Sequence, residues 1–146
     1  MRAMIGSDHA GIDGRNAVAA VLADRGWEIQ HLGPSNVDEK TDYPDVAHDV
    51  AAGVTSGDAE IGILVCGTGQ GMAMTANKYC GIRAAVITDA FTAEMARGHN
   101  DANVACFGER VLGADKITEL LGVFLDTPFE GGRHGDRVNK IDRVPG

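Results

Sequence analysis

Residues 61–71, with the sequence IGILVCGTGQG, decide the fold. The first six, from Ile61 to Cys66, form a nearly continuous apolar run, which is typical of a central parallel strand covered on both faces. Glycine then recurs at every second position, at Gly67, Gly69 and Gly71. We expect a helix to follow this turn, so that its free N–H groups face the carboxyl end of the strand. Such N–H groups form a natural seat for a phosphate or an oxyanion.

The rest of the chain alternates short apolar runs with helical patterns. Strands are predicted at 3–5, 27–32, 61–66, 84–87 and 104–107. Helices are predicted at 12–25, 44–55, 69–78 and 91–97, around 117–124, and from about 132. This alternation indicates right-handed crossovers and an α/β fold with a parallel sheet of about five strands. We expect residues 1–146 to form a single domain.

Composition excludes several classes of protein. The chain has 146 residues, of which 44% are hydrophobic and 23% charged, as is ordinary for a globular protein. Its net charge of −8 argues against nucleic acid or an anionic membrane as a partner. No apolar run is as long as a membrane span or a secretory signal, which predicts a cytoplasmic protein. The three cysteines have no CxxC spacing, which argues against a disulfide framework or a zinc knuckle.

Polar residues gather close to the strand ends. Asp8 and His9 follow the first strand, Cys66 ends the third, and His99 and Asn100 precede the fifth. Ligands of parallel sheets bind at the carboxyl ends of the strands, so we expect these groups to converge on one edge. Each also has a simpler structural explanation: a helix cap for Asp8, a polar helix end for His99, and core packing for Cys66.

The glycine turn does not match familiar nucleotide or phosphatase motifs. A P-loop needs a lysine directly after the glycines, but the next lysine is Lys78. The dinucleotide fingerprint fails because Met72 stands after Gly71, where a glycine should close the motif. A cysteine phosphatase would need an arginine near Met72 or Ala73. Cys66 therefore remains either a packed small residue or a thiol made reactive by the following helix.

A metal site built from the histidines is disfavoured, because no pair has ligand spacing on one helix. The C-terminal segment 131–146 differs in charge from the acidic chain. It carries four basic residues, Arg133, Arg137, Lys140 and Arg143, against Asp136 and Asp142. This local positive charge is either a solvated helix face or an anion site.

Eight short motifs, taken together, resemble the ribose-5-phosphate isomerase B family, which includes the galactose-6-phosphate isomerase subunits. They are GSDHAG (6–11), TDYPD (41–45), CGTGQG (66–71), ANK (76–78), GIRAA (81–85), HNDAN (99–103), FGERV (107–111) and EGGRHGDRV (130–138). The resemblance implies a Rossmann-like three-layer α/β/α sandwich. It also implies a homodimer, possibly paired into a tetramer, with shared active sites and neither metal nor cofactor. The implied reaction interconverts an aldose phosphate and a ketose phosphate.

The resemblance also implies a role for each matching residue. Cys66 would be the base that moves a proton between C2 and C1, as in the branch of the family that lacks a glutamate at position 72. The amides of Gly67, Gly69 and Gly71 would stabilise the enediolate. Other implied roles are sugar-oxygen binding by Thr68, ring opening by His99 and Asp8, sugar binding by Asn100 and Tyr43, and phosphate binding by His9, Arg110, Arg133 and Arg137, with His134 beside them. His99, Asn100 and Arg110 would come from the second subunit.

Two alternatives remain open. The substrate could be allose 6-phosphate, galactose 6-phosphate or a four-carbon ketose phosphate, since relatives with these activities share the same turn. A non-catalytic sensor of sugar phosphates on the same fold is the other alternative. Cys80 and Cys106 are interpreted as structural.

Overall fold

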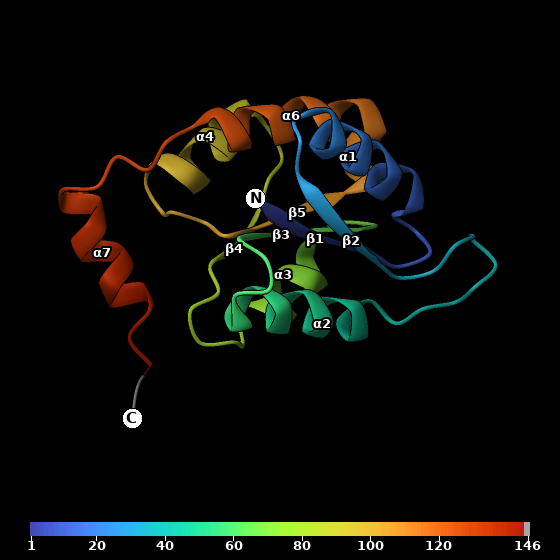
Figure 1. Ribbon diagram of the computed structural model, residues 1–146, viewed down its shortest axis with the longest axis horizontal. Helices are drawn as coiled ribbons and strands as arrows, with labels where there is room; N and C mark the ends of the chain where they lie inside the picture. Colours follow the sequence, from blue (N-terminus) through green and yellow to red (C-terminus); the bar gives the residue numbers. More distant parts are fainter. Residues whose placement is uncertain (145–146) are drawn as a thin grey trace.

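Five parallel strands form one sheet in the order β2-β1-β3-β5-β4 (Figure 1). The computed structural model describes residues 1–144. The strands are β1 (Arg2–Ser7), β2 (Glu28–Leu32), β3 (Ile61–Cys66), β4 (Ala84–Val86) and β5 (Val104–Gly108). The apolar run from Ile61 to Cys66 is the central strand, β3, and all six of its residues are buried. The predicted five-strand parallel sheet is confirmed.

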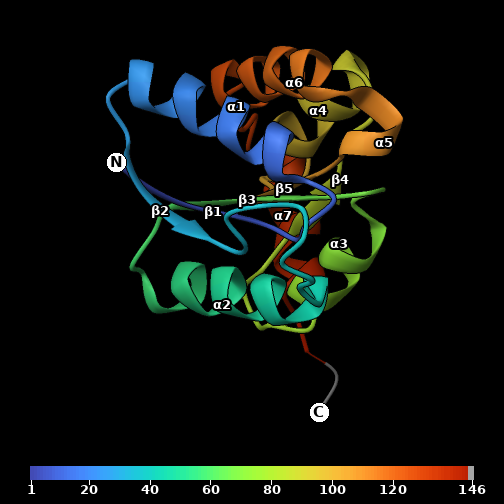
Figure 2. The same cartoon turned by 90° about the vertical axis from the view of Figure 1, so that its right-hand side faces the viewer.

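Helices cover both faces of the sheet (Figure 2). Helices α1 (Ile12–Asp24), α4 (Ala90–Gly98) and α6 (Ala114–Asp126) pack on one face. Helices α2 (Tyr43–Ser56) and α3 (Gln70–Ala76) pack on the other. The architecture is therefore the three-layer α/β/α sandwich that the resemblance implied.

Each face has its own apolar core, because β3 sends alternate side chains to opposite sides. Ile63 and Val65 join Val18, Leu22 and Phe107 beneath α1 and α6, and all five are fully buried. Leu64 and Cys66 point to the other face, with Met72, Ala76 and Cys106 under α2 and α3. Cys66 is thus both a member of a core and the last residue of its strand.

Two short helices lie outside the sandwich pattern. The sequence did not predict α5 (Glu109–Leu112), a single turn directly after β5. Helix α7 (Arg133–Ile141), which was predicted, projects from the body beyond the β4 edge of the sheet (Figure 1). Among the residues that the structure describes, none of these helices is long and apolar enough to cross a membrane.

Candidate active site

The glycine turn after β3 holds the Cys66 thiol against a backbone amide. The N–H of Gly69 donates to Sγ of Cys66 over 3.1 Å, and the thiol residue is only 5% exposed. Gly69 has a φ of +81°, and a Cβ there would lie 3.1 Å from the carbonyl carbon of Phe107. Because L-residues avoid that conformation, the contact between the amide and the sulfur depends on a glycine at this position.

A hollow of about 460 Å³ opens above this turn at the carboxyl edge of the sheet. It brings together eight of the predicted site residues: Asp8, His9, Tyr43, Cys66, Gly67, Thr68, Gly71 and Arg110. Gly69 lies in the same turn. Three further residues line its wall without having been predicted: Ala10 and Met74, whose side chains are apolar, and Gln70, interpreted only as a spacer between the glycines.

Asp8 and His9 are each fixed by a hydrogen bond from a backbone amide. Oδ1 of the buried Asp8 accepts a hydrogen bond of 2.9 Å from the N–H of Ala10. Nδ1 of His9 accepts one of 3.2 Å from the N–H of Thr41, in the loop before α2. A neutral imidazole that accepts at Nδ1 carries its hydrogen on Nε2. His9 can therefore donate to an anionic ligand without being protonated first.

Two of the glycines make room for site side chains rather than for a ligand alone. A Cβ on Gly71 would lie 2.3 Å from Cε2 of Tyr43, so the tyrosine ring lies directly over this glycine. A Cβ on Gly67 would lie 3.3 Å from Cδ of Arg110, whose backbone N–H also donates to the Gly67 carbonyl. The resemblance placed Arg110 in a second subunit, whereas the structure places it in the hollow of its own chain.

The other two cysteines have surroundings that differ from that of Cys66. Cys106 is fully buried beneath the same face of the sheet, and this burial, together with the nearby Cys66, raises the pKa of its thiol well above the usual range. Cys80 is exposed and lies outside the hollow. All three thiols are free.

The remaining predicted residues form a second group, which lies at the amino ends of the strands, on the side of the sheet away from the hollow. His99 is the C-cap of α4, and Asn100 follows it, before the amino end of β5. The start of α7 supplies Arg133, His134 and Arg137 at the same edge, where His134 stacks on His99 at 4.0 Å between ring centroids. The expectation that all the polar groups converge on one edge within the chain is therefore wrong. A helix-to-strand connection leads to the amino end of the next strand, not to its carboxyl end.

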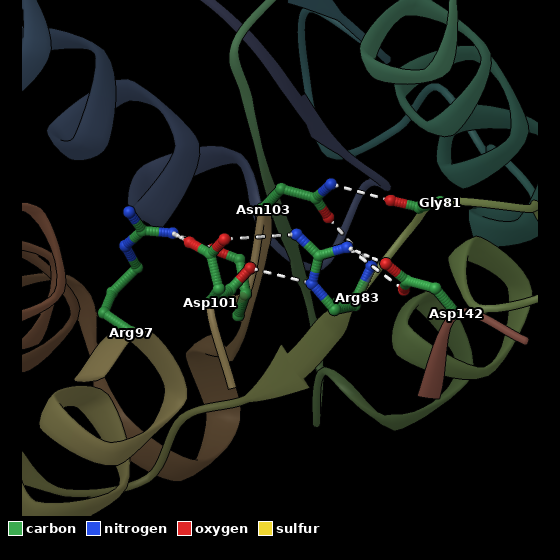
Figure 3. A network of polar contacts seen from close by, with 7 residues as sticks. Gly81, Arg83, Arg97, Asp101, Asn103 and Asp142 are labelled. Carbon is green, nitrogen blue, oxygen red and sulfur yellow. Dashed lines mark hydrogen bonds and ion pairs between the residues drawn. The ribbon is translucent and has the colours of Figure 1, made fainter. Parts of the chain in front are cut away.

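An ion-pair network shapes this second group (Figure 3). Nε of Arg83 donates to the carbonyl of Asp101 over 2.9 Å, and its Nη1 contacts Oδ2 of Asp142, just after α7, also at 2.9 Å. Arg97 contacts Oδ1 of Asp101 at 2.9 Å, while Asn103 accepts from the Arg83 backbone. Asp101 has a φ of +47°, a strained conformation for a non-glycine residue. The network thus holds the loop after His99 and anchors the end of α7.

One cluster in this second group offers three candidate metal ligands. Atoms of His99, Glu130 and His134 lie within 4.8 Å of one another. The two imidazole planes are stacked, only 15° from parallel. An imidazole binds a metal with a lone pair in the plane of its ring, and one ion cannot lie in two stacked planes. The cluster therefore does not form a metal site as it stands.

The fold and the hollow define a class: α/β proteins with a thiol-bearing hollow at the carboxyl edge of a parallel sheet. Comparison with known proteins identifies a family within this class. The family model of the ribose/galactose isomerases matches residues 3–141. The chain belongs to this family, and it is an isomerase.

Individual relatives match along nearly the whole chain. Ribose-5-phosphate isomerase B of Escherichia coli is 41% identical over 139 residues, 95% of this chain and 93% of that protein. D-erythrulose-4-phosphate isomerase of Pectobacterium atrosepticum is 41% identical over 137 residues, 94% and 90% of the two chains. The solved structure of Clostridium thermocellum ribose-5-phosphate isomerase B superposes with a TM-score of 0.93 at 45% identity, covering 97% of this chain and 95% of that one.

Proposed function

We propose that the protein interconverts ribose 5-phosphate and ribulose 5-phosphate, with Cys66 as the base that moves the proton. The observation that carries this proposal is the Cys66 thiol itself, which lines the hollow and accepts the Gly69 N–H at 3.1 Å. The thiolate is the form of a cysteine that can accept a proton. The buried Asp8 and the exposed Thr68 lie in the same hollow.

In the proposed reaction the Cys66 thiolate takes the proton from C2 of the open-chain aldose phosphate. The C2–H electron pair forms the C1=C2 double bond, and the aldehyde oxygen becomes the anionic oxygen of a cis-enediolate. The thiol then returns its proton to C1, and the hydroxyl proton moves from O2 to O1, which leaves the ketose. Thr68 holds the sugar oxygens during this transfer.

The amides of the glycine turn would stabilise the enediolate. Because the N–H of Gly69 already donates to sulfur, we assign this task to the N–H groups of Gly67 and Gly71. Each donor of this kind contributes about 3–4 kcal/mol to transition-state stabilisation.

We propose that the phosphate binds where imidazole and guanidinium donors meet. His9 presents its Nε2 hydrogen, and Arg110 lies at the same hollow. Arg133 and Arg137 belong to the group at the opposite edge, so they can reach this phosphate only from a second copy of the chain. A guanidinium donates two parallel hydrogen bonds to a phosphate, which suits a dianion.

We therefore infer a homodimer with shared sites. One chain supplies Cys66 and its hollow, and the other supplies His99, Asn100, Arg133, His134 and Arg137. The separation of these two groups within a single chain supports this division. A two-fold symmetric dimer then forms two equivalent sites. The predicted cytoplasmic location stays a prediction.

A four-carbon substrate is the alternative that a specific observation favours, because the Pectobacterium relative named for D-erythrulose 4-phosphate is as similar as the Escherichia coli protein. Comparing kcat/KM over four-, five- and six-carbon sugar phosphates decides between them. We expect the largest value for ribose 5-phosphate. A larger value for a four- or six-carbon sugar would change the substrate but keep the mechanism, and a complete lack of turnover would indicate a sensor.

The role of Cys66 is tested by Cys66→Ala, with Cys80→Ala as the matched control outside the hollow. We expect Cys66→Ala to lower kcat by about 100- to 10,000-fold, as loss of a general base does, while the binding of ribose 5-phosphate is retained. It should also stop the exchange of the C2 proton with deuterium from the solvent. Undiminished turnover in Cys66→Ala would exclude the thiol from the proton transfer.

A further inference from the structure

Glu130, in the connection between α6 and α7, is held against the end of α4. Its backbone N–H donates to the Gly98 carbonyl over 3.0 Å. Its carboxylate occupies the space that a side chain at position 98 would need, since a Cβ on Gly98 would lie 2.9 Å from Oε2 of Glu130. The last residue of α4 therefore makes room for a carboxylate that originates 32 residues later in the chain.

This carboxylate faces both imidazoles of the second group. Oε2 of Glu130 lies 3.1 Å from Nε2 of His99, and Oε1 lies 3.8 Å from Nε2 of His134. A lone pair on nitrogen and an anionic oxygen at 3.1 Å repel each other, whereas an N–H at the same place is attracted. The carboxylate therefore favours the tautomer of His99 that carries its hydrogen on Nε2. The lone pair of the neutral ring is then on Nδ1.

His134 fixes the plane of the His99 ring. It is 6% exposed and stacks on His99, whose own side chain remains 35% exposed. Burial lowers the pKa of His134, and the neighbouring charges of His99 and Arg133 lower it further. The lowered pKa favours the neutral form of His134, which therefore presents an uncharged ring to His99.

We propose that Glu130 is the positioning residue for His99, holding the hydrogen on Nε2 so that Nδ1 is the atom that accepts a proton from the substrate. This inference rests on the ring-opening role proposed for His99. In that step Nδ1 takes the proton of the anomeric hydroxyl, a C1=O bond forms as the ring C–O bond breaks, and the ring oxygen takes a proton from Asp8. The positive charge that develops on His99 is then stabilised by the carboxylate 3.1 Å away.

The tautomer can be observed without turnover. In protein labelled with ¹⁵N-histidine, long-range ¹H–¹⁵N spectra distinguish a protonated ring nitrogen from one with a lone pair. We expect His99 to show the Nε2–H tautomer in the native protein and a mixture of tautomers in Glu130→Ala. Glu119→Gln, which removes an exposed carboxylate on α6, is the matched control and should leave the His99 signals unchanged.

Kinetic measurements distinguish a positioning role of Glu130 from a role in substrate binding. We expect Glu130→Ala to lower kcat for ribose 5-phosphate about 10- to 100-fold, as loss of a positioning partner typically does, with KM within about twofold of the wild type. The kcat of Glu130→Gln, which keeps a hydrogen-bond acceptor but loses the charge, should lie between the kcat of the wild type and that of Glu130→Ala. An unchanged His99 tautomer in Glu130→Ala, or a raised KM with unchanged kcat, would overturn the proposal. Failure of the proposed function itself appears separately, as undiminished turnover in Cys66→Ala.

Discussion

The contact between Gly71 and Tyr43 gives a sharp prediction, because Gly71→Ala should impair substrate binding without unfolding the protein. The new Cβ would lie 2.3 Å from Cε2 and 2.4 Å from Cζ of the tyrosine ring. Carbon atoms pack at about 3.5–4.0 Å, so the ring must move by about 1 Å or more. Tyr43 is 40% exposed and can swing toward solvent without disturbing either core.

The expected magnitudes follow from this movement. In a helix, alanine is more stable than glycine by about 0.5–1 kcal/mol, which offsets the lost ring contacts. The free energy of unfolding should therefore change by less than about 1 kcal/mol. If Tyr43 donates a hydrogen bond to the sugar, its loss removes about 0.5–1.5 kcal/mol of binding, which raises KM about 2- to 13-fold.

The assay compares KM for ribose 5-phosphate and urea unfolding in a double-mutant cycle with Tyr43→Phe. Because both changes remove the same hydroxyl contact, Gly71→Ala should add little to KM in the Tyr43→Phe background. Gly122→Ala, in α6, is the control: a Cβ there would meet nothing closer than Arg25 at 3.6 Å, so KM should not change. Fully additive effects of Gly71→Ala and Tyr43→Phe would refute the reasoning.

Three further predictions concern other parts of the molecule. Gly69→Ala forces a side chain into a left-handed conformation and should destabilise the protein by about 1–3 kcal/mol in urea unfolding. It should also lower kcat, because the amide moves away from the Cys66 sulfur. An unaltered kcat would show that this amide does not contribute to catalysis. Arg83→Met removes the contacts of the guanidinium to Asp101 and Asp142 and should lower the free energy of unfolding by about 2 kcal/mol. An unchanged free energy of unfolding would mean that the network in Figure 3 contributes no net stability. Burial raises the pKa of Glu109, so its contribution to stability is complete below the pKa of an unfolded glutamate and is lost as pH rises through the folded value. Glu109→Gln should therefore be more stable than the wild type at pH 7, with the difference shrinking toward pH 4 in chemical unfolding; a difference that grows on acidification would contradict the assignment.

The sequence predicted the sheet well because each strand can be recognised from its own local pattern of apolar residues. The apolar run before Cys66 is typical of a buried strand. The helices can be recognised from the period of their apolar residues or from the residues that cap them. The single turn of α5 was missed because four residues are too few to show a period. The start of α3 at Gln70 rather than Gly69 follows from the left-handed φ of that glycine.

The site was predicted less completely, because chain order does not show which side chains meet. Asp8, Cys66 and Thr68 lie at or just after the carboxyl ends of strands and do share the hollow. His99 precedes a strand and lies at the opposite edge, and its neighbour Glu130 comes from a connection whose path no local pattern reveals. The observation that no histidine pair has ligand spacing on one helix was limited in the same way, since His99 at the end of α4 and His134 in α7 come from separate segments and stack only in the folded chain.

The most direct test of the account is to restore activity from two inactive variants. Cys66→Ala and His99→Asn chains, co-expressed with different affinity tags and purified through both tags, give mixed dimers. If one chain supplies Cys66 and the other His99, each mixed dimer has one site with both residues intact and one with neither. Such dimers should show about half of the wild-type activity, while each variant alone stays inactive. Mixed dimers that remain as inactive as their parents would contradict the shared site.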